Sequence, residues 1–146
     1  MKYRRIAVVL FLCAAWMQTA VARERAHTFH GTVIAFQRAY LCVNGNGNWA
    51  LLIKLDPRHS DEPEWAIVPF THPCNSNIDP IPVYSKMQRF RLVRSPFCDE
   101  TILRDSPANE LRLPWTLLAS GPAQELPYGQ TVPCYHSLDL PLVPAV

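Results

Sequence analysis

Two short segments of the chain each place a cysteine and a histidine two positions apart. His72 and Cys74 form one such pair, and Cys134 and His136 form the other. Two thiolates and two imidazoles are a donor set that binds zinc in tetrahedral geometry. One hypothesis is therefore a metal-binding protein that uses these four residues.

Disulfide formation is the competing interpretation of the same cysteines. Of the five cysteines, four remain after removal of a predicted N-terminal leader: Cys42, Cys74, Cys98 and Cys134. Four cysteines in an exported domain indicate two disulfides, because an oxidising compartment favours them over thiolate ligands. Three connectivities are open, and chain order favours Cys42–Cys74 and Cys98–Cys134. On this interpretation we expect no metal and no other cofactor.

The first 22 residues have the features of a secretory signal peptide. Lys2, Arg4 and Arg5 are basic, residues 6–16 are mostly apolar, and Ala20-Val21-Ala22 has the small-residue pattern that signal peptidase recognises. An uncleaved anchor is the alternative, because the apolar stretch is near the lower length limit for a transmembrane helix. We predict cleavage, with no stable membrane span afterwards and a secreted or periplasmic location.

Cleavage after Ala22 changes the charge of the chain. Three of the 14 Lys and Arg residues lie before this point, which leaves 11 basic against 12 acidic residues. The single domain of residues 23–146 is thus nearly neutral and has no general electrostatic attraction for nucleic acid or anionic lipid. Neither is therefore expected as a partner.

The prolines and the hydrophobic pattern predict a mostly β domain. All 14 prolines follow the leader, where they prevent long helices. Loop is expected from 95 to 112, and a proline-rich C-terminal tail, held by Cys134, from 121 to 146. A short helical turn is expected within 83–88. Alternating or β-favouring runs predict five strands, at 27–37, 49–55, 65–70, 86–94 and 113–120.

This strand order resembles that of a small five-stranded OB-like barrel. The resemblance covers about residues 29–120 and consists of three early strands followed by a crossover and two more. It implies that Cys42, Cys74 and Cys98 lie at one pole of the barrel, where the tail would bring Cys134. An open β-sandwich is the alternative architecture.

Catalytic signatures are missing from the sequence. It contains no glycine-rich phosphate loop and no G-x-S-x-G, H-E-x-x-H or C-x-x-C motif. A braced scaffold with irregular polar loops favours a non-enzymatic binding or accessory module with a protein, peptide or glycan partner. Acidic pairs such as Asp99-Glu100 leave a small secreted hydrolase as the alternative.

A candidate binding surface is predicted from polar and aromatic residues beside turns and on one strand face. Asn44 and Asn46 belong to an Asn-Gly turn, and Tyr40 precedes it. Arg89 and Arg91 alternate with apolar residues, as basic side chains do beside aromatic ones in ligand grooves. The alternative for the arginines is a solvated strand face.

The tryptophans of the predicted strands have two interpretations. Trp49, Trp65 and Trp115 could line a ligand platform. Indole rings more often fill cores, with the N–H bonded at an edge. The core interpretation is favoured.

Overall fold

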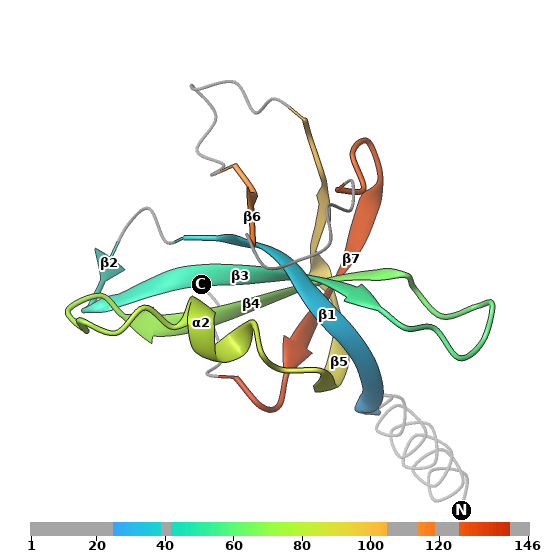
Figure 1. Ribbon diagram of the computed structural model, residues 1–146, viewed down its shortest axis with the longest axis horizontal. Coiled ribbons are helices and arrows are strands. Elements are labelled where there is room, and N and C mark those ends of the chain that lie inside the picture. The colour runs from blue at the N-terminus through green and yellow to red at the C-terminus, as the bar shows by residue number, and fades with distance from the viewer. Residues whose placement is uncertain (1–24, 39–41, 105–113, 119–125, 141–146) are drawn as a thin grey trace, which may run out of the picture.

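The computed structural model describes residues 25–38, 42–104, 114–118 and 126–140, and Figure 1 shows their arrangement. The short helix α2 (Ile81–Tyr84) is accompanied by seven strands. No helix in these four ranges is long and apolar enough to cross a membrane. The strands are β1 (His27–Gln37), β2 (Cys42–Val43), β3 (Asn46–Leu55), β4 (Trp65–Pro73), β5 (Arg89–Thr101), β6 (Thr116–Leu117) and β7 (Thr131–Ser137).

Five of these strands pair into a closed ring. β3 pairs antiparallel with β1 and β4, and β5 pairs antiparallel with β1 and β7. The ring closes where β7 runs parallel to β4, with Ile67 opposite Cys134. The two-residue strands β2 and β6 lie outside the ring, against β3 and β1. In Figure 1 the long β3–β4 hairpin runs across the view, β1 crosses it, and β5 and β7 lie on the right.

Side-chain alternation along the strands builds two cores. One core fills the ring and the other lies on its outer surface. On β3, for example, Leu51 belongs to the inner core and Leu52 to the outer core, because successive side chains point to opposite faces. Ile102, Leu126 and Val132 from the later part of the chain complete the outer core. Both faces of β3 are therefore buried, which explains its continuous apolar run.

The first four predicted strands are present, with shifted ends. β1 spans the predicted residues, β3 starts at Asn46 instead of Trp49, and β4 continues to Pro73. β5 begins at Arg89 and runs on to Thr101, so the prediction of loop from residue 95 is wrong. The helical turn lies slightly earlier than predicted.

The segment predicted to be a C-terminal tail contributes a central strand instead. β7 lies between β4 and β5 and completes the ring. Of the predicted strand at 113–120, the structure describes residues 114–118, which contain β6. Pro133 is tolerated within β7 because it lies opposite a break in the ladder, between the Ser95–Cys134 and Glu100–Val132 pairs. A proline at this position removes no hydrogen bond from the ladder.

Two disulfides brace the fold, Cys42–Cys74 and Cys98–Cys134. This is the pairing that chain order favoured, and two disulfides indicate an oxidising environment. The expectation that all four cysteines meet at one pole is wrong. Cys134 lies opposite Ile67, about 23 Å along the chain from Cys74 at the rise of an extended strand.

Candidate ligand-binding site

Three side chains lie at one end of the ring, where β1, β3 and β4 extend past the inner core. We call this end the mouth of the ring. Arg38, Trp49 and His72 each lie two residues beyond the last fully inward-facing core residue of their strand. Those core residues are Phe36, Leu51 and Phe70. Because side chains alternate along a strand, the three share the inner face. The two-residue alternation that directs apolar side chains into the ring thus also places an arginine, a tryptophan and a histidine at its mouth.

Aromatic contacts hold this group in place. The Trp49 ring stacks on Phe70 with centroids 6.3 Å apart and an interplanar angle of 26°. His72 meets Trp49 edge-on at 6.3 Å. The guanidinium carbon of Arg38 lies 5.8 Å from the Trp49 ring centroid and 5.5 Å from that of Phe36. These distances allow cation–π attraction, which keeps a long side chain ordered at an exposed position.

The loop between β4 and α2 folds over the same end. His72 Nε2 lies 3.0 Å from the carbonyl oxygen of Ile78, and the Ser76 hydroxyl accepts the N–H of Ile78. Asp79 accepts a 2.8 Å hydrogen bond from Arg38 through one carboxylate oxygen and the N–H of Ile81 through the other. The disulfide Cys42–Cys74 fixes the start of the loop. The loop is therefore tied to β4, β1 and β2 at once.

These elements line an open hollow of about 400 Å³. This volume falls in the usual range for small-molecule sites. The ends of the strands, the β4–α2 loop and the Cys42–Cys74 disulfide form its wall. Its residues are Arg38, Cys42, Trp49, His72, Pro73, Cys74, Ser76, Asn77, Ile78, Asp79 and Pro80.

The predicted binding residues are divided between the two ends of the ring. Asn44, with φ of 52°, forms the β2–β3 turn, and Asn46 pairs with Pro73 beside the hollow. Arg89 and Arg91 instead pair with the start of β1. That position is about 30 Å from the turn along β3, so the structure does not bring the five residues together. Tyr40 lies outside the described residues.

The metal hypothesis is wrong for the structure as it stands. Cys74 and Cys134 are both oxidised, in different disulfides, so neither offers a thiolate. His72 lies at the hollow, whereas His136 lies on β7 opposite Val93. Among the described residues, no three cysteine, histidine or acidic side chains converge on one point.

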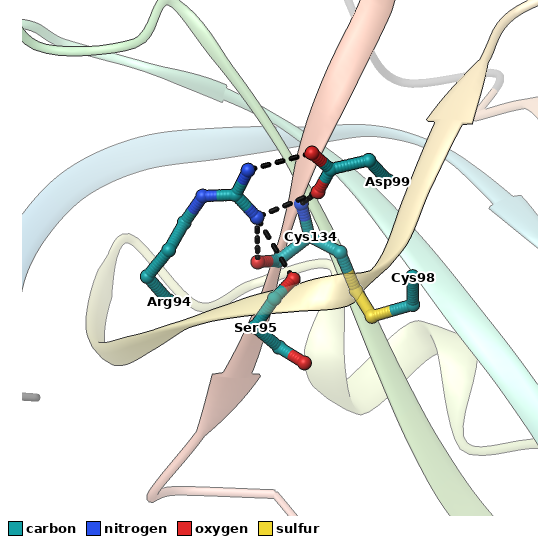
Figure 2. The surroundings of a disulfide bond; sticks show 5 residues. All are labelled: Arg94, Ser95, Cys98, Asp99 and Cys134. Atoms are coloured by element: carbon teal, nitrogen blue, oxygen red, sulfur yellow. Dashed lines mark hydrogen bonds and ion pairs between the residues drawn. A yellow bond between two sulfur atoms is a disulfide. The ribbon is translucent and has the colours of Figure 1, made fainter. Parts of the chain in front are cut away.

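A second cluster surrounds the Cys98–Cys134 disulfide. Figure 2 shows the guanidinium of Arg94 between the carboxylate of Asp99 and the carbonyl oxygens of Ser95 and Cys134. The hydrogen bonds from Arg94 hold the pKa of Asp99 below its ordinary value. An acid of this kind stays ionised and fully engaged, so this cluster braces a bulge in β5 and offers no free general acid for a hydrolase.

Sequence reasoning missed the group at the hollow in two ways. The sequence favoured Trp49 as a core residue and His72 as a loop residue, with a metal site as the alternative for His72. Trp49 does pack against the inner core, but both residues lie on strands at the ring mouth and line the hollow. The useful signal was present: each is the next same-face position after an unbroken inward-facing run. The ion pair of Arg38 with Asp79 joins residues 41 positions apart, and no local pattern indicates it.

Comparison with known proteins does not assign this chain to a family. No family model, no curated protein and no solved structure matches the chain. A fold can in any case host many activities, so the function must be inferred from the chemistry of the site.

Proposed function

We propose that this protein is a non-enzymatic binding or accessory module that holds part of its partner in the hollow at the mouth of the ring. The observation that supports this most directly is the bracing of the hollow. A disulfide, the Arg38–Asp79 ion pair and the His72–Ile78 contact fix its loop. A wall ordered in advance costs less conformational entropy on binding, so a rigid hollow favours recognition.

The strand order favours the same location. The ring runs β1–β3–β4–β7–β5, with β4 and β7 parallel and α2 between β4 and β5. We interpret this ring as an OB-like barrel. In that fold the face of the second and third strands and the adjoining loops bind ligands. β3 and β4 occupy those places here, and the hollow lies at their shared end.

Export belongs to the same proposal. The signal-like residues 1–22 would deliver the chain to a secreted or periplasmic location, where both disulfides can form and persist. The partner would then be a protein, peptide or glycan of that compartment.

Arrays of peptides and glycans test the binding role. The full-length chain is produced in a host that exports it and is probed beside Arg38→Met and Asp79→Asn. The matched control is Asp139→Asn, which weakens a similar ion pair, Arg91–Asp139 at 2.7 Å, remote from the hollow. We expect array signals that both hollow variants lose and the control keeps.

Two results would contradict the proposal. Signals that are equal in all variants would place binding elsewhere, and turnover of ester, peptide or glycoside substrates would show an enzyme. Folding is checked separately. Asp79→Asn should change the free energy of unfolding by less than about 1 kcal/mol, because exposed ion pairs contribute little and an asparagine can still accept the N–H of Ile81.

A further inference from the structure

We infer that the ligand of the hollow is an uncharged saccharide segment of a glycan, an inference that rests on the proposed function. The guanidinium–carboxylate pair of Arg38 and Asp79 would bind neighbouring sugar hydroxyls, and Trp49 would contact the apolar face of the sugar ring. Three properties of the hollow favour this ligand over an anion or a cation, and the pairing of β3 disfavours an extended peptide.

The first property is charge balance. Arg38 and Asp79 lie 2.8 Å apart, and their side chains are 60% and 40% exposed. Their formal charges cancel, and His72 is the other titratable side chain among the described residues that line the hollow. A carboxylate or phosphate that approached Arg38 would be repelled by Asp79. A cation that approached Asp79 would be repelled by Arg38. An uncharged ligand avoids both repulsions.

The second property is the mixture of donors and acceptors. A guanidinium carries five N–H donors, and the two oxygens of a carboxylate offer about four acceptor sites. The hydrogen bonds that Asp79 accepts from Arg38 and from the N–H of Ile81 therefore leave capacity on both side chains. A hydroxyl both donates and accepts. Of two adjacent sugar hydroxyls, one can therefore donate to Asp79 while the next accepts from Arg38. Asn77 and Ser76 add an amide and a hydroxyl to the same wall.

The third property is the apolar part of the wall. Trp49 is half-buried, and Ile78 is 68% exposed on the facing loop. Both line the hollow together with two prolines. A sugar ring carries C–H groups on one face and hydroxyls around its edge, so it can use an apolar surface and polar groups together. Binding sites commonly combine apolar walls with a few placed polar groups in this way.

The pairing of β3 argues against an extended peptide that adds to this strand. β3 is paired on both sides here: Gly47 lies between Cys42 of β2 and His72 of β4. Its N–H and C=O groups are already used, so it presents no free edge to which a peptide could add as a strand. At β3, recognition of a ligand therefore relies on side chains.

A titration followed by NMR tests this inference. The full-length chain, exported by its host and labelled with ¹⁵N, is titrated with maltohexaose, cellohexaose and the fully N-acetylated hexasaccharide of chitin. An oligogalacturonate and a mixed peptide pool are the charged and peptide probes. The readout is the indole N–H signal of Trp49, assigned with Trp49→Phe. We expect a saturable shift with at least one neutral saccharide, and a Kd at least tenfold weaker in Arg38→Met and in Asp79→Asn but unchanged in Asp139→Asn.

The other outcomes distinguish an error in the ligand class from an error in the location of the binding site. A Trp49 shift only with the oligogalacturonate or only with peptides overturns the saccharide inference and leaves the hollow as a binding site. Saccharide binding that leaves the Trp49 signal unmoved, and that the hollow variants do not weaken, overturns both. No saturable shift with any neutral saccharide also overturns the inference, while the peptide arrays still test the proposed function.

Discussion

The carboxylate of Asp99 binds the guanidinium of Arg94 through two hydrogen bonds of 2.6 Å each. One of its oxygens also accepts the backbone N–H of Cys134. The ion pair therefore closes the bulge of β5 and ties it to β7 beside the disulfide. Because Asp99 and Arg94 are each about one-third exposed, solvent screens the pair and its contribution to stability is modest.

The first prediction concerns acid. Hydrogen bonds from Arg94 lower the pKa of Asp99, although partial burial acts in the opposite direction. The folded-state pKa is therefore below that of the unfolded chain. The resulting stability is fully present above about pH 4 and is lost as the pH falls through the folded-state value. In urea unfolding between pH 6 and pH 2, we expect Asp99→Asn to lose less stability than the wild type.

Asp139 provides the comparison for that experiment. A hydrogen bond from Arg91 lowers its pKa as well, so Asp139→Asn should also flatten the acid limb of the profile. The double variant should be the flattest. An acid limb that is as steep in all three variants as in the wild type would show that neither carboxylate controls it.

The second prediction compares the two disulfides. They close chain segments of similar length, with sequence separations of 32 and 36, so restriction of the unfolded chain contributes about 4 kcal/mol for each. Cys134 is fully buried in the outer core, whereas Cys42 and Cys74 are exposed. We expect Cys98→Ala/Cys134→Ala to lower the free energy of unfolding more than Cys42→Ala/Cys74→Ala does. Equal losses in urea titration would contradict the packing argument.

The third prediction concerns a close approach between strands. A Cβ atom added at Gly31 would lie 2.5 Å from the backbone oxygen of Lys54 and 3.1 Å from the Cα of Leu55. Backbone atoms cannot move aside cheaply, so Gly31→Ala should cost about 1–3 kcal/mol. The control is Thr32→Ala on the exposed face of the same strand, with a change within about 0.5 kcal/mol. Thermal unfolding of both variants measures the difference, and a neutral Gly31→Ala would disprove the contact.

The fourth prediction contrasts two phenylalanines of β5. Phe97, in the bulge, is 96% exposed, whereas Phe90 is fully buried in the ring. Phe97→Ala should leave the free energy of unfolding within about 0.5 kcal/mol of the wild type. Phe90→Ala should cost about 3–5 kcal/mol, because it removes a buried ring and leaves a cavity. A large loss of stability for Phe97→Ala would show that its ring packs against the fold.

Local sequence pattern predicted strands from runs of β-favouring residues, even in β1, where a bulge between Val33 and Ala35 interrupts the alternation. β1 matches its predicted range, because its β-favouring run is bounded by polar residues. β7 was missed because Pro133 is unfavourable in a central strand unless the partner ladder is broken opposite it. That break depends on the bulge of β5, which the sequence near Pro133 does not encode.

The sequence could predict some residues of the hollow but not how they come together. The alternation of apolar residues could have placed Trp49 and His72 at the ring mouth. The ion pair of Arg38 with Asp79 depends on the loop folding back over β1, which is a tertiary event. Residue types alone could not distinguish His72 as a wall residue from His72 as a metal ligand.

The position of β7 has a consequence for biogenesis. In a chain that emerges N-terminus first, from a ribosome or through a membrane, β1, β3, β4 and β5 are all available before the strand that must separate β4 from β5. Until then two strand edges remain unsatisfied and prone to wrong pairing. Cys42 and Cys74 can be joined during emergence, but Cys98 must wait for Cys134. Oxidation of that second bridge would therefore report the moment at which β7 has arrived.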